Sequence, residues 1–135
     1  MNNICVDLDG VLARYDGWKG IRHFGKPFPY AREFMKSLSK LGHVVIFTCR
    51  CKEPEEHDIA MAEGLSVDER KKLVEEWLNK NEIPFDEIYV GQGKPFAQVY
   101  IDDRAVVFSP SKNGYSTYGY SKALIETQFL MGVKI

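Results

Sequence analysis

Blocks rich in apolar residues alternate along this chain with longer stretches in which apolar and polar residues are mixed. Apolar runs of strand length occupy residues 4–8, 43–48, 87–90, 99–101 and 106–108. Strands that are apolar nearly throughout, rather than at every second residue, are typical of a parallel sheet with both faces covered. The pattern therefore predicts an α/β fold in three layers, with a mainly parallel central sheet.

Between these runs, apolar positions recur at helical spacing. One helix is predicted to open at Pro29 and to end before Gly42, with a buried face formed by Ala31, Phe34, Met35, Leu38 and Leu41. A second is predicted after the capping-box pair Ser66 and Glu69, with a buried stripe formed by Leu73, Val74, Trp77 and Leu78. A closing helix is predicted over 121–131. Strands alternating with helices over 135 residues indicate one Rossmann-like domain spanning 1–135.

Two acidic residues follow the first predicted strand at once. Asp7 and Asp9 are two positions apart, a spacing that places both side chains on the same side of a strand. Neighbouring carboxylates repel each other, so a cation or a reacting group between them explains the pair better than two solvated loop acids do. Thr48 ends the second predicted strand, and Asp102 and Asp103 follow the fourth. Because such folds place their sites at the carboxyl ends of strands, these residues predict one shared site.

The residue types at these positions suit phosphoryl transfer. A carboxylate beside a bound dication can attack phosphorus, and a second carboxylate two residues on can protonate the leaving oxygen and then activate water. Carboxylates without a histidine cluster favour Mg²⁺ over zinc, and Asp102 and Asp103 would supply the remaining protein ligand and its support. The charge of Lys94 and the hydroxyl of Thr48 suit a phosphoryl group in transfer.

Four sequence elements together resemble the motifs of the haloacid dehalogenase (HAD) superfamily of phosphohydrolases. They are the segment 7–11 (Asp-Leu-Asp-Gly-Val), Thr48 at its strand end, the segment 93–95 (Gly-Lys-Pro) and the segment 101–103 (Ile-Asp-Asp). The resemblance spans residues 4–105. Within it, segments 47–50 and 93–105 look like those of small bacterial and phage phosphatases named for capsule polysaccharide biosynthesis.

This resemblance implies a HAD-like fold and a hydrolase, namely a Mg²⁺-dependent phosphoric monoester phosphatase that works through an aspartyl phosphate. By the same resemblance, Asp7 is the nucleophile and Asp9 is the general acid and base. Thr48 and Lys94 are implied to hold the phosphoryl group during transfer.

The resemblance also implies the ligands of the metal ion. Mg²⁺ would be bound by Asp7, by the backbone carbonyl of Asp9, and by the acidic pair Asp102 and Asp103. In related enzymes the second of two adjacent acids is often the direct ligand. That tendency favours Asp103 as the ligand, with Asp102 in support.

The intervals between the motifs are short. The first holds one loop and one helix, and the second holds an acidic segment, one helix and one strand, so the family member implied has no cap domain and an open site. An open site fits a phosphosugar or glycan-linked phosphate, or closure by a second subunit in a homodimer. A nucleotidase or polynucleotide end phosphatase is the alternative within enzymes. Outside them, the alternative is a phosphoacceptor domain or a non-catalytic phosphate-binding protein.

The loop after the first predicted strand is basic and carries aromatic residues. Arg22, His23 and Trp18 predict a flap that attracts an anionic substrate and stacks a ring against it. Arg50, two residues after Thr48, is within range of a phosphate bound at the same site. The alternative interpretation is a solvated basic loop with no substrate contact.

Composition and charge limit the classes of partner that we expect for this protein. With 44% hydrophobic residues, 27% charged residues and a formal net charge of −1, the chain lacks the basic footprint of a nucleic-acid-binding protein. Its apolar runs fall short of the roughly 20 residues that a membrane span needs, and no signal peptide fits before Asp7. Three cysteines fit a reducing compartment. We therefore expect a cytoplasmic protein that acts on a phosphorylated small molecule or glycan, away from membranes.

Overall fold

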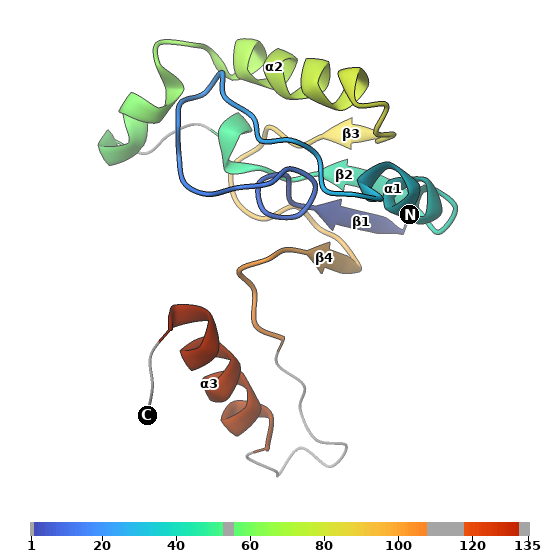
Figure 1. Ribbon diagram of the computed structural model, residues 1–135, viewed down its shortest axis with the longest axis vertical. Helices are drawn as coiled ribbons and strands as arrows, with labels where there is room; N and C mark the ends of the chain where they lie inside the picture. The colour runs from blue at the N-terminus through green and yellow to red at the C-terminus, as the bar shows by residue number, and fades with distance from the viewer. Residues whose placement is uncertain (1, 53–55, 108–117, 133–135) are drawn as a thin grey trace. The chain divides into compact units, whose positions relative to one another are not determined.

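The computed structural model describes residues 2–52, 56–107 and 118–132, and it forms two compact units, Met1–Asp103 and Arg104–Ile135 (Figure 1). Among the described residues, the first unit carries the sheet, two α-helices and two short 3₁₀-helices, and the second carries one α-helix. The expectation of one domain over 1–135 stays a prediction. Among the described residues, no helix has the length and apolar character needed to cross a membrane.

The sheet of the first unit has four strands in the order β3-β2-β1-β4, and every neighbouring pair is parallel. The strands are β1 (Asn3–Val6), β2 (His43–Ile46), β3 (Glu87–Ile88) and β4 (Val99–Ile101). The predicted parallel α/β fold is therefore confirmed. The strands are shorter than the apolar runs that predicted them, so the polar residues of interest lie just beyond the strand ends rather than within strands.

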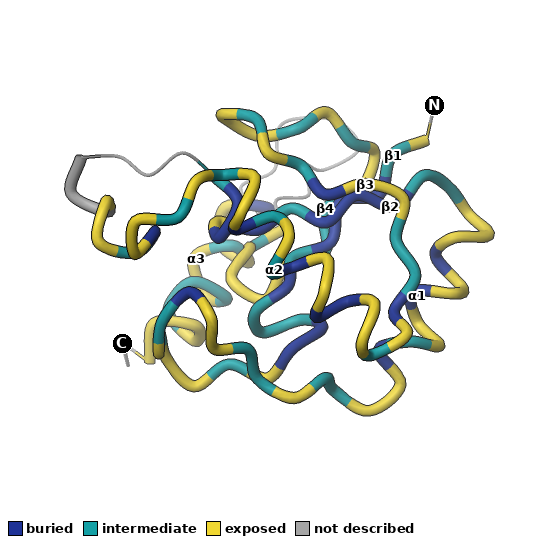
Figure 2. Tube along the Cα trace, turned by 90° about the horizontal axis from the view of Figure 1, so that it is seen from above, coloured by how far each residue is buried: buried dark blue, intermediate teal, exposed yellow. Residues whose placement is uncertain are grey.

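The helices α1 (Ala31–Ser39) and α2 (Val67–Lys80) cover one face of this sheet. The core cluster joins both helices to alternate strand residues, which face the same side: Ile4, Val6, Val44 and Ile46. The connections β1–α1–β2 and β2–α2–β3 step in one direction across the sheet, and right-handed crossovers in one direction place their helices on one face. Figure 2 shows buried residues along β1, β2 and the inner side of both helices. The full three-layer arrangement stays a prediction.

The helix α1 buries a narrower face than the sequence predicted. Ala31, Met35 and Leu38 are buried as expected, whereas Phe34 is 42% exposed and Leu41 is 70% exposed. At 100° per residue, Phe34 lies at the edge of the stripe defined by the three buried residues. Leu41 follows the end of the helix at Ser39, so helical spacing no longer orients it. The predicted burial of these two residues was wrong.

The helix α2 follows its predicted signals closely. Ser66 accepts a hydrogen bond from the backbone of Glu69, and the Glu69 side chain accepts one from the backbone of Ser66, which completes the capping box. Trp77 is buried on the inner face of the helix, and its indole donates to the carbonyl of Gly25 at 3.2 Å. Its ring also stacks against Phe24, with 6.0 Å between the ring centroids. These contacts fasten the loop after β1 to the helix.

The second unit contains α3 (Tyr118–Met131), which begins three residues before the predicted helix over 121–131. The strand predicted over 106–108 is wrong at Val106 and Val107, which lie outside any strand. Phe108 lies outside the described residues. Neither valine pairs with a strand among the described residues, so apolar character alone did not suffice to form β-structure there.

Candidate functional site

Three carboxylates from two neighbouring strands meet at one edge of the sheet. Asp7 follows β1 directly, Asp102 and Asp103 follow β4 directly, and Val6 pairs in register with Ile101. The backbone of Asp7 donates to the carbonyl of Ile101 at 2.9 Å, which extends the pairing beyond the strand. Each of the three aspartates offers a carboxylate oxygen, and these atoms all lie within 4.8 Å of one another. The structure therefore brings two distant segments together at the edge where the parallel strands end, as the sequence predicted.

A glycine allows the loop after β1 to approach this cluster. Gly10 has a φ of +89°, a region that L-residues rarely adopt, and a Cβ atom there would overlap the carboxylate of Asp103. Gly10 also donates to the carbonyl of Ala13 at 2.8 Å within a tight turn. Glycine is thus favoured here for two separate reasons, backbone conformation and space for an acidic side chain.

The cluster raises the pKa of Asp7 from 3.8 to about 7, mainly through burial and further through the charges of Asp102, Asp103 and Asp9. A hydrogen bond from the backbone of Leu8, at 2.8 Å, works in the opposite direction. Burial disfavours the charged form because water no longer solvates it, and nearby negative charges add to that cost. A bound cation would offset both effects, because it stabilises the charged form. The cluster consists of carboxylates alone, which as hard oxygen donors fit Mg²⁺.

Asp9 lies in a different environment, although it is only two residues away. Its carboxylate is paired with the buried guanidinium of Arg50, with Nε–Oδ2 at 2.7 Å and Nη2–Oδ1 at 3.0 Å. The argument that Asp7 and Asp9 share one side of a strand was wrong, because β1 ends at Val6 and both residues lie beyond its end. The side chain of Asp9 is not a member of the carboxylate cluster. That its backbone carbonyl binds the metal stays a prediction.

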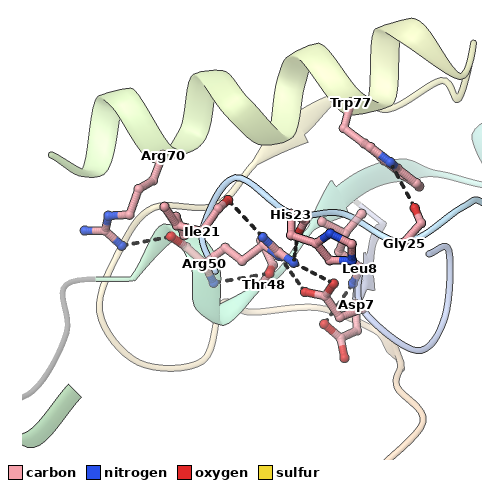
Figure 3. A network of polar contacts seen from close by, with 10 residues as sticks. Asp7, Leu8, Ile21, His23, Gly25, Thr48, Arg50, Arg70 and Trp77 are labelled. Atoms are coloured by element: carbon pink, nitrogen blue, oxygen red, sulfur yellow. Dashed lines mark hydrogen bonds and ion pairs between the residues drawn. The ribbon is translucent and has the colours of Figure 1, made fainter. Parts of the chain in front are cut away.

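Arg50 is turned toward the protein rather than toward solvent. Only 3% of its surface is exposed, and its guanidinium donates to the carbonyls of Ile21 at 3.1 Å and His23 at 2.8 Å (Figure 3). Its central carbon lies 4.9 Å from the ring centroid of Trp18 and 4.1 Å from that of Phe24. These contacts occupy the planar group that was predicted to meet a phosphate. The geometry therefore favours a structural partner for Asp9 over a direct substrate contact.

Thr48 and Lys94 lie on either side of β1 in the sheet order, after β2 and before β4. Thr48 is 2% exposed, and its Oγ1 accepts from the backbone of Arg50 at 3.3 Å, which caps the 3₁₀-helix Cys49–Cys51. Lys94 is exposed, and its Nζ lies 4.0 Å from the ring centroid of Tyr100. Contact of either side chain with a phosphoryl group stays a prediction.

The predicted flap residues lie on the loop that Arg50 holds. Arg22 and His23 expose their side chains, while the carbonyl of His23 binds the buried guanidinium. Trp18 is half-buried against that same guanidinium, so its ring is not fully available to stack on a ligand. Nothing in the sequence indicated these backbone carbonyl acceptors. Every residue type has a backbone carbonyl, so the residue types at positions 21 and 23 do not reveal that their carbonyls accept from an arginine.

The fold and the site define an α/β protein with an all-parallel, Rossmann-like sheet and an acidic cluster at the carboxyl ends of two strands. No protein-family model and no curated protein matches the chain. A crystal structure of a target protein from Vibrio cholerae is similar, with 29% sequence identity and a TM-score of 0.50. The match covers 93% of this chain and 99% of that one. The name of that protein states no activity, so the similarity concerns the fold.

Proposed function

We propose that this protein is a Mg²⁺-dependent phosphomonoesterase of the HAD type, in which Asp7 carries the phosphoryl group during turnover. The observation that carries the proposal is the convergence of Asp7, Asp102 and Asp103 at the ends of two neighbouring parallel strands. The same residues form two of the four motifs by which the sequence resembles that superfamily. Motif and geometry thus point to the same edge of the sheet.

Asp7, Asp102 and Asp103 are the side chains that would hold the metal ion, because their oxygens lie close enough to share one cation. When bound, Mg²⁺ would offset the repulsion between an anionic phosphate ester and the carboxylate that attacks it. Gly10 supports this arrangement, since any side chain at that position would displace the carboxylate of Asp103.

The reaction needs two steps from the side chains of this chain. In the first, an oxygen of Asp7 bonds to phosphorus, the bond from phosphorus to the ester oxygen breaks, and Asp9 gives its proton to that departing oxygen. In the second, Asp9 takes a proton from water while the water oxygen attacks phosphorus, which releases phosphate and restores the carboxylate of Asp7. The sum is one ester and one water converted into one alcohol and one phosphate.

Thr48 and Lys94 would stabilise the phosphoryl group in transfer. The oxygen of Thr48 accepts a hydrogen bond from the backbone of Arg50, so its own O–H is the part of the hydroxyl that donates. A buried donor of this kind needs no reorganisation when charge develops on a phosphoryl oxygen. Lys94 would supply positive charge from a flexible side chain on the approach to β4.

We further propose a phosphosugar or glycan-linked phosphate as the substrate class. Among the described residues, only a loop and α1 lie between β1 and β2, and only 3₁₀-helices and α2 lie between β2 and β3. Neither interval, as far as the structure describes it, provides a cap that would enclose a small metabolite. The exposed side chains of Arg22 and His23 offer cationic and hydrogen-bonding groups at the loop beside Asp9.

Hydrolysis of p-nitrophenyl phosphate tests the activity, measured with Mg²⁺, with EDTA, and in the variant Asp7→Asn. We expect turnover that requires Mg²⁺ and that the variant loses while keeping its fold. Asp16→Asn is a matched control, because Asp16 is 80% exposed in its side chain and pairs only with Lys19 among the contacts described for it. Turnover that survives in Asp7→Asn would remove the proposed nucleophile. A folded, Mg²⁺-loaded protein that hydrolyses no ester in a panel of phosphosugars and nucleotides would contradict the proposed activity altogether.

A further inference from the structure

We infer that Arg50 is a positioning residue that fixes the orientation of Asp9, and that the same guanidinium holds the loop carrying Arg22 and His23. The inference rests on the proposed function, because Asp9 has a proton to transfer only if the protein cleaves phosphate esters. It assigns to Arg50 a role in the proton-transfer step rather than the substrate contact that its place in the sequence predicted.

The first argument is the geometry of the pair. Nε and Nη2 of Arg50 donate to the two different oxygens of Asp9, at 2.7 and 3.0 Å, so the carboxylate is fixed in both position and rotation. A single donor would fix only one oxygen and leave the carboxylate free to rotate. Each carboxylate oxygen has a second lone pair that does not face the guanidinium. That lone pair remains able to exchange a proton with a leaving group or with water.

The second argument is the burial of the arginine. Its side chain is 2% exposed, against 14% for that of Asp9, so the rigid partner is the arginine and the acid is the member that reaches solvent. The flat guanidinium also lies against the rings of Trp18 and Phe24, at 4.9 and 4.1 Å from their centroids. These rings restrict the tilt of the plane. A lysine could not reproduce a planar fork stacked on an aromatic ring.

The third argument is that one group serves two parts of the site. Nε and Nη2 of Arg50 bind Asp9. In addition, Nη1 donates to the carbonyl of Ile21 and Nη2 to the carbonyl of His23, on either side of Arg22 (Figure 3). The loop therefore cannot shift without disturbing the plane that holds the acid. Ile21 is further fixed by its own backbone N–H, which donates to the carboxylate of Glu63.

The dependence of rate on the leaving group tests this role. We would measure kcat/KM for p-nitrophenyl phosphate, whose phenol leaves readily, and for phenyl phosphate, whose phenol needs protonation more. These esters differ by one nitro group, and its effect on binding largely cancels when the ratio of the two rates is compared between variant and wild type. In Arg50→Lys we expect kcat/KM for phenyl phosphate to fall by about 10-fold or more beyond the fall for p-nitrophenyl phosphate, since a well-placed general acid contributes at least that much. In Asp9→Asn the fall for phenyl phosphate should exceed the fall for p-nitrophenyl phosphate by a still larger factor.

Arg70→Lys is the matched control. Arg70 is also a buried arginine, 4% exposed, but among the residues that the structure describes it donates to the carbonyls of Arg50, Lys52 and Leu65 and not to an acid. Its substitution should lower stability without changing the ratio between the two esters. If Arg50→Lys does not fold, Trp18→Leu provides a milder test, because it removes one ring from the guanidinium and leaves all its hydrogen bonds.

The outcomes separate the two proposals. A wild-type protein that cleaves neither ester, nor any in the wider panel, contradicts the proposed function and this inference with it. A wild-type protein that cleaves both, with Arg50→Lys and Trp18→Leu reducing the two rates equally, keeps the function and overturns the positioning role. A further increase in the preference for p-nitrophenyl phosphate when Arg50→Lys is added to Asp9→Asn would also overturn it, because the arginine would then act independently of the acid.

Discussion

Asp7 and Asp9 are the same residue type, two positions apart just after β1, and yet they lie in opposite electrostatic environments. Asp7 belongs to a cluster of carboxylates that raises its pKa to about 7, chiefly through burial. Asp9 is paired through both oxygens with a buried arginine. The first environment disfavours the charged form of its acid, and the second has a counter-charge built into the fold. The difference indicates how one short segment can supply two carboxylates with separate roles.

Removing the acid that Arg50 holds should have an effect on turnover second only to the loss expected for Asp7→Asn. Asp9→Asn should lower kcat by about 100- to 10,000-fold, since an amide cannot donate and recover the proton that the proposed mechanism assigns to this position. Steady-state kinetics with Mg²⁺ at saturation measures it. A variant that turns over at the wild-type rate would remove the acid and base role from Asp9 and make its ion pair purely structural.

A change at Gly10 should disturb the carboxylate cluster selectively. Gly10→Ala forces a methyl group into the carboxylate of Asp103, so Mg²⁺ affinity measured by calorimetry should fall by about 10- to 100-fold. Gly17→Ala is the control, because Gly17 also has positive φ, +118°, but no atom of the described residues lies within 4 Å of the place that its Cβ would take. Both variants carry the same kind of backbone strain, so an equal loss of affinity would mean that Asp103 is not a ligand.

The same substitution at the two acids should change stability in opposite directions. At pH 8 in EDTA, Asp7→Asn should raise the free energy of unfolding by roughly 2 kcal/mol, because it removes a carboxylate that is costly to ionise. Asp9→Asn should lower it by roughly 2 kcal/mol, because it leaves the buried guanidinium of Arg50 without its counter-charge. Chemical denaturation measures both. Effects of the same sign would contradict the contrast between the two environments.

The raised pKa of Asp7 also predicts how the free energy of unfolding changes with pH. The folded protein holds the proton of Asp7 up to a pKa of about 7, whereas an unfolded aspartate releases it near 3.8. Between these values the folded state binds more protons, so the stability of the metal-free protein should fall as pH rises from about 4 to about 7. Asp7→Asn or saturating Mg²⁺ should flatten this contribution. An Asp7-dependent rise in stability over the same interval would contradict the raised pKa.

The smallest effect is expected at the exposed flap. Arg22→Gln should raise KM for a bulky anionic substrate by about threefold and leave KM for p-nitrophenyl phosphate nearly unchanged, as is usual for a solvent-exposed charge. Comparing the two substrates in one preparation measures the difference. Equal changes for both would favour the alternative of a solvated loop that makes no substrate contact.

The sequence predicted the parallel sheet and the meeting of its polar strand ends, because both follow from apolar runs and from the topology of parallel strands. It also located α2, since the capping box of Ser66 and Glu69 is a local signal. It failed where a local pattern ended early. The alternation argument for Asp7 and Asp9 assumed a strand that in fact stops at Val6.

The role of Arg50 could not be read from the sequence for a different reason. Its partners are an acid 41 residues away and two backbone carbonyls of a loop, and their association depends on tertiary packing. A carbonyl belongs to every residue, so no residue type at positions 21 or 23 indicates an arginine partner. An arginine that binds phosphate and an arginine that holds Asp9 would occupy the same position in the sequence. The sequence therefore could not distinguish the two roles.

Direct identification of the phosphorylated residue is the most decisive measurement. The protein would be mixed with a substrate and Mg²⁺, quenched in acid within the first turnover, reduced with borohydride, and mapped by peptide mass spectrometry. We expect conversion of Asp7 to homoserine, which marks an acyl phosphate at that carboxylate, with Asp9, Asp102 and Asp103 unchanged. Turnover accompanied by a mark at another aspartate, or by none in a quench series that spans the first turnover, would contradict Asp7 as the nucleophile.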